Sequence, residues 1–241
     1  MSNPLRNISF IIPAKNEEAY IGKAIESILS QPKEFVKEII VVDNNSEDRT
    51  SEIAGSYPGV KVLKETIPGT NQARQRGVEA ASGDIVAFVD SDNRLPENWS
   101  RVCLEYLNRP GVVGMSGPYK NYDQTWLGNL ITFYGFLIVS YPAYWFVHYI
   151  LKKGSIMLGG NMAANREVLS SLGGLDTRFK FYGDDVSAGK RLRKAGKVIW
   201  THRLISYSSV RRYKKHGWFK TTFRYFMNFL WVILFDKPFT Q

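Results

Sequence analysis

Short apolar runs alternate with amphipathic runs through residues 8–90, and this alternation constrains the fold more than any other feature of the chain. The apolar runs have the length and the β-branched content of buried strands; they are residues 8–14 (ISFIIPA), 38–43 (EIIVVD), 60–65 (VKVLKE) and 84–90 (DIVAFVD). The runs between them space their apolar side chains as a helix does; they are residues 17–31, 46–57 and 71–82. Strands that alternate with helices predict an α/β fold with a mostly parallel sheet flanked by helices.

Polar side chains follow three of the four predicted strands where each strand ends. They occupy residues 14–17, 43–45 and 90–93. In an open α/β sheet, ligands bind at the carboxyl ends of the strands, so the three clusters converge on one predicted site. The chain has neither the G-x-G-x-x-G nor the G-x-x-x-x-G-K-[ST] pattern, which excludes the usual dinucleotide and P-loop sites.

Asp90 and Asp92 follow the last of these strands, with Ser91 between them. This spacing lets both carboxylates turn toward one cation, and hard ions such as Mn²⁺ and Mg²⁺ take oxygen ligands and bridge to substrate phosphates. Asp and Ser are also ordinary turn residues, so the motif is weak when it stands alone. Its position at the end of a buried strand favours a metal site.

Asp43 ends the second predicted strand. A carboxylate at this place, about thirty residues after the end of the first strand, suits a hydrogen bond to a ribose hydroxyl or to a base N–H. An Asx turn at the start of the next helix is the alternative, and Asn44, Asn45 and Ser46 would satisfy it equally well.

Asp184 and Asp185 begin a predicted basic helix, DDVSAGKRLRKAG. Negative charge is favoured at a helix N-terminus, so one interpretation is that the two residues only cap the helix. The other interpretation is a general base, because adjacent carboxylates disfavour double ionisation and one pKa then rises into a useful range.

The single cysteine, Cys103, excludes an intrachain disulfide, and we expect a small buried hydrophobe there. The first predicted strand begins near the N-terminus, so we expect no signal peptide before the fold. The net charge of +10 is uneven, because thirteen Lys and Arg residues and one acid follow Asp185. This basic, aromatic part suits an anionic partner such as a lipid headgroup, a diphosphate or a nucleic acid, and charge alone does not choose among them.

Residues 124–151 contain no Asp, Glu, Lys or Arg and are long enough to cross a bilayer. A single crossing would place two parts of one fold on opposite sides of the membrane. We therefore favour an interfacial or re-entrant helical pair, then a buried insertion, over a true span. In the tail, Lys220, Arg224 and Asn228 are four residues apart and predict one polar stripe on an aromatic helix, which is typical of a membrane interface. A helix packed on the sheet is the alternative.

The order of these motifs resembles the inverting family 2 glycosyltransferases, which have the GT-A fold, a Rossmann-like α/β architecture. The likeness covers residues 7–205 and rests on IIPAKNEE, VVDNNSEDRT, ARQRGVEAASGDIVAFVDSD, GGNMAANREVL, GGLD and GDDVSAGKRLRKAG in that order. Each piece is weak, but the combination is specific. It implies a catalytic domain over residues 1–205, with the apolar insertion at 124–151, and a basic tail over 206–241 that lies at a membrane interface.

The resemblance also implies a role for each matched residue. Asp90 and Asp92 would hold a divalent metal, Mn²⁺ or Mg²⁺. Asp185 would be the catalytic base, and Asp184 replaces the family's more usual Glu. Gly160, Asn161 and Asp184 would lie beneath or beside the acceptor. The nucleotide would be held by Pro13, Ala14, Asn16, Glu17, Asp43, Arg74, Asp90 and Ser91.

Further features depart from the family pattern or extend it. Asn93 follows the metal pair where another acid is frequent, and the Q-x-x-R-W motif of processive synthases is missing, which favours transfer of one sugar at a time. His202 follows a predicted strand and is a candidate third metal ligand, although a lone His is more often structural. A basic run is a candidate to close over the diphosphate or to contact lipid phosphates, with a solvated basic face as the alternative; it contains Arg211, Arg212, Lys214 and Lys215.

We therefore expect an enzyme that moves one sugar from a nucleoside diphosphate sugar to a hydroxyl or phosphate acceptor by a single displacement. The apolar segment and the basic tail favour a polyprenyl-phosphate or other lipid-linked acceptor of a cell-envelope glycan. They also favour a protein peripheral on the cytoplasmic face of the cell membrane, without a nucleic-acid partner. One rival is a sugar-nucleotide pyrophosphorylase, but the first loop lacks the Gly-rich, basic sequence that it needs. The other is a degenerate domain that serves as a membrane adaptor, which has no need of the full set of acids.

Overall fold

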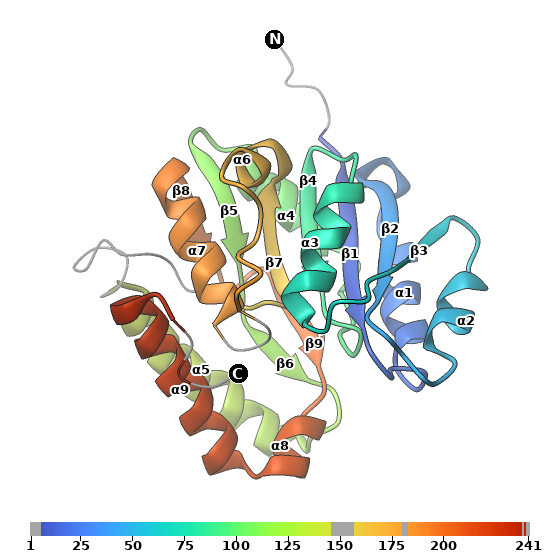
Figure 1. Cartoon of the computed structure of the whole chain (residues 1–241). Helices are drawn as coiled ribbons and strands as arrows, with labels where there is room; N and C mark the ends of the chain where they lie inside the picture. The colour runs from blue at the N-terminus through green and yellow to red at the C-terminus, as the bar shows by residue number, and fades with distance from the viewer. Residues whose placement is uncertain (1–5, 146–156, 180–182, 238, 240–241) are drawn as a thin grey trace.

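The computed structural model describes residues 6–145, 157–179, 183–237 and 239, and it shows a central sheet with helices against it (Figure 1). Among these residues the main sheet contains β1 (Ile8–Ala14), β2 (Val36–Asp43), β3 (Val60–Lys64), β4 (Ile85–Val89), β5 (Val112–Ser116), β7 (Asn161–Asn165) and β8 (Lys197–Trp200). A small second sheet pairs β6 (Tyr119–Asn121) with β9 (Ser206–Ser208). The helices are α1 (Ile21–Leu29), a 3-10 helix (Lys33–Phe35), α2 (Thr50–Gly55), α3 (Thr70–Ala80), α4 (Trp99–Leu107), α5 (Trp126–Trp145), α6 (Arg166–Ser171), α7 (Asp184–Ala195), α8 (Arg211–His216) and α9 (Trp218–Phe235).

The main sheet has the strand order β3-β2-β1-β4-β7-β5-β8. Its strands pair in parallel, except that β7 is antiparallel to both of its neighbours. The predicted mostly parallel sheet is confirmed, and the four predicted strands match β1 to β4 to within two residues at each end. Because β7 runs against the others, it begins at the edge where the parallel strands end.

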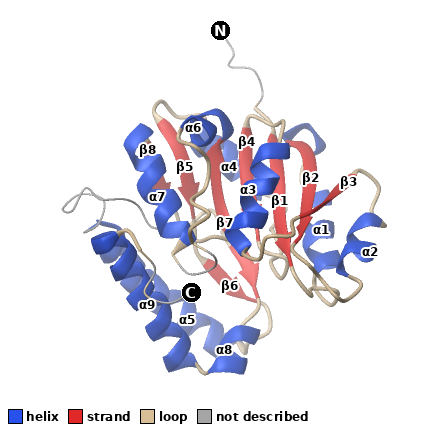
Figure 2. Cartoon of the chain, viewed as in Figure 1, coloured by secondary structure: helices blue, strands red, loops and turns tan. Residues whose placement is uncertain are grey.

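Helices cover both faces of the sheet, and the alternation of side chains along β1 explains why (Figure 2). Phe10 and Ile12 belong to the core on one face, together with Ile25 of α1 and Trp99 of α4. The rings of Phe10 and Trp99 lie 5.7 Å apart, centre to centre. Ile11 belongs to the core on the other face, which α3 and α7 cover. Strands buried on both faces need a nearly continuous apolar sequence, which is the pattern that ISFIIPA shows.

The helices α5, α8 and α9 lie beyond the carboxyl edge of the sheet, at the bottom of the view (Figure 1). Val232 and Ile233 of α9 pack against Phe179 and against Val186 of α7. Within the described part of the chain, none of the helices combines the length and the hydropathy that crossing a bilayer requires. Residues 146–151 of the predicted apolar segment lie outside the described residues.

The tail helix α9 differs from the predicted amphipathic pattern. Asn228 is 1 % exposed; it donates to the carbonyl oxygen of Arg224 at 2.9 Å and accepts the N–H of Phe239 at 2.9 Å. The predicted polar stripe therefore does not stay on the outside of the helix, because Asn228 is buried on the inner side, where it accepts the N–H of Phe239. The exposed side of the helix carries Phe223 and Phe226 instead.

Candidate active site

The loops after β1 and β2 are bonded to each other at the carboxyl edge of the sheet. Asn16 has a φ of 55°, in the left-handed region that Asn tolerates better than most residues. Its N–H donates to Ser46 Oγ at 3.0 Å, and its Oδ1 accepts the N–H of Glu47 at 2.8 Å. Pro13 and Ala14 are buried at the end of β1 directly before this loop. The segments predicted to hold the nucleotide thus form one connected wall.

Asp43 ends β2 and is 5 % exposed. One oxygen of its carboxylate accepts the N–H of Ser46 at 3.0 Å, and the other accepts the hydroxyl of Ser51 at 2.8 Å. The carboxylate therefore holds the turn into α2, as the structural alternative expected. Its contact with a base or a ribose stays a prediction.

The end of β4 and the start of β7 bring a carboxylate and a glycine together. A Cβ atom on Gly160 would lie 2.3 Å from the Asp90 carboxylate carbon, so only glycine permits this approach. Asn93 holds the turn from below by donating to the carbonyl oxygen of Gly160 at 2.7 Å. Ser91 is buried, whereas Asp90 keeps 39 % of its side chain exposed and Asp92 keeps 15 %.

Arg74 of α3 lies beneath this edge with only 4 % of its side chain exposed. Its guanidinium donates to Asp90 Oδ1 at 2.7 Å and also pairs with Asp184. Burial alone would lower the pKa of Arg74, but the two carboxylates raise it, so the side chain stays charged. We predicted that Arg74 faces the nucleotide. In the structure its guanidinium is buried between the two acids and joins the turn after β4 to α7, so a contact with the nucleotide stays a prediction.

Asp184 and Asp185 form the first turn of α7, directly after Gly183. Burial raises the pKa of Asp185 to about 7, with a second contribution from the neighbouring Asp184 carboxylate. Burial also raises the pKa of Asp184, although Arg74 opposes the rise. No side chain caps the helix at Gly183, and Asp185 Oδ1 accepts the N–H of Val186 at 2.8 Å. A carboxyl group that titrates near neutral pH has the property that a general base requires.

Arg211 is the first residue of α8, and it links the tail to the loops at the carboxyl edge. Its Nε donates to Asp92 Oδ2 at 2.9 Å and its Nη2 to Glu17 Oε1 at 2.5 Å. The guanidinium also lies 4.5 Å from the centre of the Tyr20 ring. Burial raises the pKa of both carboxyls, and Arg211 offsets only part of that rise. The sequence indicated a basic run here without its partners, because no local pattern identifies acids so distant in the chain.

Asn161 lies beneath the site and is 0 % exposed. Its Oδ1 accepts the indole N–H of Trp99 at 2.9 Å, and its Nδ2 donates to backbone carbonyls, including that of Leu204 at 2.7 Å. Tyr119, which the sequence did not single out, accepts the N–H of Gly160 at 2.9 Å through its hydroxyl. Asn161 is thus bonded into the core beneath the carboxyl edge, and Asp184 is buried as well; the predicted place of both residues beneath or beside an acceptor stays a prediction.

The acids at the carboxyl edge fit a hard divalent cation. Asp90 is partly exposed, and burial and the charge of Asp90 raise the pKa of Asp92, a rise that a bound cation would reverse. Glu17 Oε2 and Asn93 Oδ1 are buried and have no hydrogen-bond partner. Asn93 directly follows Asp92 in the sequence, and Glu17 is joined to Asp92 through Arg211. Two carboxylates with substrate phosphates are a usual ligand set for Mg²⁺.

His202 does not join the acids. It is exposed on the turn after β8, and β7 and β5 separate that strand from β4. Among the described residues, no group of three or more His, Cys, Asp or Glu side chains is arranged to hold a metal. The role of His202 as a third metal ligand stays a prediction.

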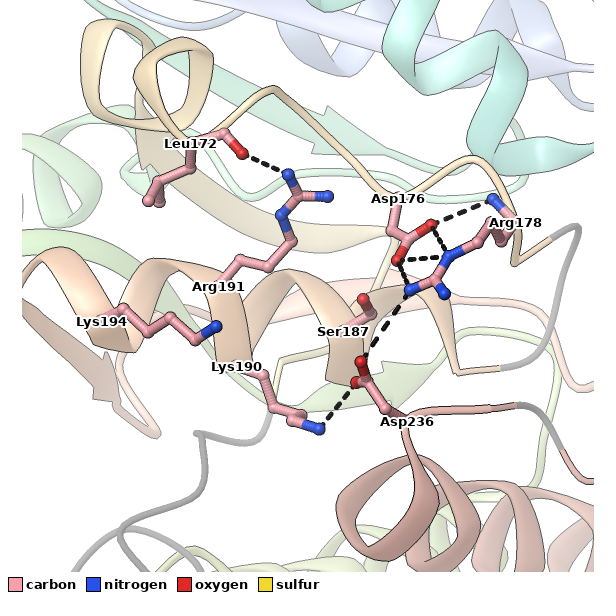
Figure 3. Close-up of a pocket in the computed structure, with 8 residues that line it drawn as sticks. All are labelled: Leu172, Asp176, Arg178, Ser187, Lys190, Arg191, Lys194 and Asp236. Atoms are coloured by element: carbon pink, nitrogen blue, oxygen red, sulfur yellow. Dashed lines mark hydrogen bonds and ion pairs between the residues drawn. The ribbon is translucent and has the colours of Figure 1, made fainter.

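A cavity of about 310 Å³ opens away from these acids, between α7 and the end of α9 (Figure 3). Its charged side chains are largely paired with one another. Arg178 donates to Asp176 at 2.6 Å, and Lys190 donates to Asp236 at 2.7 Å. None of the predicted site residues lines it, so the candidate site remains the carboxyl edge of the sheet.

A model of the family described as "Glycosyl transferase family 2" matches residues 9–173. Among curated proteins, the chain is 32 % identical over 123 residues to the glycosyltransferase GlyG of Streptococcus pneumoniae; the match covers 49 % of this chain and 40 % of that protein. The chain thus spans less than half the length of this relative.

Two solved structures share the fold. A mannosyltransferase of Pyrobaculum calidifontis, PcManGT, in complex with GDP-Man and Mn²⁺, matches with a TM-score of 0.71 and 23 % identity, over 92 % of this chain and 62 % of that one. The glucosyl-3-phosphoglycerate synthase of Mycobacterium tuberculosis, in complex with Mn²⁺ and UDP-glucose, matches with a TM-score of 0.52 and 30 % identity, over 69 % of this chain and 58 % of that one. The predicted GT-A-type architecture is confirmed.

Proposed function

The chain belongs to glycosyl transferase family 2, and we propose that it moves one sugar from a nucleoside diphosphate sugar to an acceptor hydroxyl or phosphate, with inversion at the anomeric carbon. One observation carries the proposal. Asp90, which faces the predicted donor site, and Asp184, which adjoins a carboxyl of pKa about 7, are joined through the same buried guanidinium of Arg74. Donor-side and acceptor-side acids are thereby held in one rigid unit.

Asp90 and Asp92 would hold the divalent metal, Mn²⁺ or Mg²⁺. When bound, the metal neutralises the charge that develops on the leaving diphosphate. The protein's own contribution is to fix the two carboxylates. Arg74 orients Asp90, and Gly160 lets the backbone of β7 close the site behind it. The synthase from M. tuberculosis was solved with Mn²⁺ and UDP-glucose, which supports a metal and a nucleotide sugar here.

Asp185 would take the proton from the acceptor as that oxygen attacks the anomeric carbon. The C–O bond to the diphosphate breaks as the new glycosidic bond forms, so one displacement completes the reaction and no enzyme nucleophile is needed. A base with a pKa near 7 is ionised in a substantial fraction of molecules at neutral pH and is still strong enough to accept a proton.

The wall built from the loops after β1 and β2 would hold the nucleoside. Pro13 and Ala14 end β1, Asn16 and Glu17 lie in the loop that follows it, and Asp43 ends β2. Ser91 would support the nucleotide from the turn after β4. Asp43 would contact the base or the ribose with the acceptor positions that its two hydrogen bonds to the turn leave open.

The acceptor would be lipid-linked, such as a polyprenyl phosphate or an intermediate of a cell-envelope glycan, and the protein would be peripheral on the cytoplasmic face of the membrane. Support comes from the apolar helices α5 and α9, which lie beyond the carboxyl edge (Figure 1). The division into a catalytic part, 1–205, and a tail, 206–241, belongs to the same proposal. Packing of α9 on α7 makes the tail an attached part of the catalytic unit.

A thermal-melting screen tests the proposal. The protein is heated with UDP- and GDP-sugars, each with and without Mn²⁺, beside Asp92→Asn as a control. We expect one nucleotide sugar to raise the melting temperature by several degrees only with the metal, and Asp92→Asn to lose the shift. Release of the nucleoside diphosphate on addition of an acceptor then identifies the transfer. Absence of any metal-dependent shift would point to the adaptor, and release of pyrophosphate from a nucleoside triphosphate would point to the pyrophosphorylase.

A further inference from the structure

Exposed large apolar side chains are concentrated in one part of the molecule. Of the sixteen among the described residues, six lie on α5, six on α9 and one, Phe239, just after α9. Isolated exposed apolar residues are normal on a protein surface, but a concentration of this kind is typical of a surface that contacts a membrane or another molecule. The two helices lie at the same end of the molecule, beyond the carboxyl edge of the sheet (Figure 1).

The exposed residues of α5 form one stripe. Leu127, Leu130, Tyr134, Ile138 and Trp145 follow one another at helical spacing, and Ile138 is 72 % exposed. Spacings of three, four or seven residues keep side chains on one face of a helix. The segment has no charged residue, so this outward face offers water only apolar and aromatic groups.

The helix α9 is apolar on its outer side as well as on its inner side. Its inner side packs on α7 through Val232 and holds Asn228 buried. Its outer side exposes Phe223, Phe226 and Leu234, which are three and eight residues apart and share a face. A helix that only covered the sheet would turn a polar side to water, so the apolar outer side of this helix suits a second apolar contact.

The charge around these helices selects the occupant. Residues 206–241 contain seven Lys and Arg and one acid. Lys214 and Lys215 of α8 and Lys220 of α9 are exposed. A second copy of this chain would bring two such basic tails together, which is unfavourable, whereas an anionic bilayer attracts them. Aromatic rings with adjoining cations are also the composition of helices that lie in a membrane interface.

We propose that the outer faces of α5 and α9 form one membrane-docking surface, which lies on an anionic lipid bilayer with the carboxyl edge of the sheet turned toward it. We define this surface by Leu130, Ile138, Phe226 and Leu234 with the cations of α8. The inference deepens the proposed function by naming its partner surface. It depends on that proposal only for the statement that the acceptor is lipid-linked. An acceptor headgroup would then reach Asp185 while its hydrocarbon chain stays in the bilayer.

Flotation of the full chain with vesicles tests the surface. The probes are vesicles of neutral phosphatidylcholine alone and vesicles containing one third anionic phosphatidylglycerol. We expect binding to the anionic vesicles, reduced about tenfold or more in Ile138→Ser/Phe226→Ser, because each lost side chain removes buried apolar area. The matched control is Leu29→Ser/Ile67→Ser, which changes two exposed apolar residues outside the surface and keeps wild-type binding. Lys214→Gln/Lys215→Gln weakens binding to anionic vesicles by about fivefold per charge and makes it less sensitive to salt.

Three outcomes overturn the docking surface. One is equal flotation of the two serine double variants. Another is a complete lack of binding by a wild-type protein that melts cooperatively. The third is a concentration-dependent dimer, seen by analytical ultracentrifugation and abolished by Ile138→Ser/Phe226→Ser, which assigns the surface to a second copy.

Quenching of tryptophan fluorescence by brominated acyl chains supplies a readout without substitution, since Trp126 and Trp145 are 76 % and 57 % exposed. The donor-induced melting shift separates the two proposals. It should be absent if the proposed reaction is wrong, and it should persist in every surface variant.

Discussion

The loops that follow β1, β2 and β4 and the helices α5, α8 and α9 flank the same edge of the sheet, yet they are stabilised in opposite ways. The loops are held by their own side chains. Asn44 alone donates to two carbonyl oxygens at 2.8 Å and accepts the N–H of Gly69 at 2.8 Å. The helices instead leave much of their apolar area uncovered. The loops are thus held by internal hydrogen bonds, whereas the helices leave an apolar surface for the docking that we propose.

Arg211 is a contact between these two regions. It belongs to the tail, but its partners are Glu17 and Asp92 of the strand-end loops. Its position is fixed from behind by Asp123, which accepts the hydroxyl of Ser209 at 2.7 Å and the N–H of Val210 at 2.9 Å. A change at Glu17 or Asp92 should therefore alter the contacts of Arg211 at the start of α8.

The largest effect should come from the base. Asp185→Asn keeps the shape of the side chain but cannot take a proton, so we expect transfer to fall by about 10²- to 10⁴-fold. The donor-induced melting shift should persist, since that side of the edge is unchanged. Glu105→Gln, the same chemical change on the exposed surface of α4, should keep full activity. An Asp185→Asn protein with wild-type turnover would remove the base assignment.

The same residue sets the expected pH profile. The carboxyl must be deprotonated to act, and burial raises its pKa to about 7, so kcat/KM should rise with pH through that value. Below it the rate should fall about tenfold per pH unit. Asp185→Asn should flatten this limb, and a wild-type profile that is flat from pH 5 to 8 would contradict the assignment.

The next effect concerns the buried link between donor-side and acceptor-side acids. Arg74→Met removes the guanidinium and leaves Asp90 and Asp184 facing each other, which should lower the free energy of unfolding by about 3–5 kcal/mol. Arg76→Met on the same helix breaks only an exposed pair with Glu79, at 3.9 Å, and should cost less than about 1 kcal/mol. Urea denaturation measures both. Equal stabilities of the two variants would show that the link is not a structural element.

The smallest effect is expected at the contact between the two regions. Arg211→Gln removes a cation from Asp92 and Glu17, so the acids should bind Mn²⁺ alone more tightly, by about fivefold for an interaction of about 1 kcal/mol. Titration followed by the electron paramagnetic resonance signal of free Mn²⁺ measures this. Arg203→Gln, which breaks the surface pair with Glu105 at 2.7 Å, is the control and should leave Mn²⁺ binding unchanged. Weaker binding in Arg211→Gln would mean that the arginine supports the metal site.

Sequence predicted the first half of the fold because its strands are apolar or β-branched runs separated by amphipathic helices. It also placed Asp90, Asp92 and Asp185 at one edge, since motif order and the geometry of parallel sheets suffice for that. The antiparallel strand β7 was not predicted, because NMAAN has neither alternation nor β-branched residues. The burial of Arg74 could not be predicted either, because it depends on Asp90 and Asp184, which other elements bring next to α3.

The tail showed a different limit. The spacing of Lys220 and Asn228 predicts that both lie on one side of α9, but it does not determine whether that side faces the protein or the solvent. Which side turns inward depends on α7, to which α9 is joined by a hydrogen bond from Lys190 to the carbonyl oxygen of Val232 at 3.2 Å. A sequence pattern that is apolar nearly all round does not distinguish the side that meets protein from the side that meets another partner.

The packing of α9 against Gly183 has a consequence for how the protein is made. Gly183 has a φ of 83°, and a Cβ atom there would lie 2.5 Å from Val232, so the helix closes directly over the residue before Asp184 and Asp185. A ribosome delivers α9 after every strand of the sheet has emerged, and chains begin to fold from their N-terminal parts during synthesis. The nascent chain can therefore assemble its sheet while the turn that carries Asp184 and Asp185 still lacks its cover. That turn is enclosed only after α9 has been released from the ribosome.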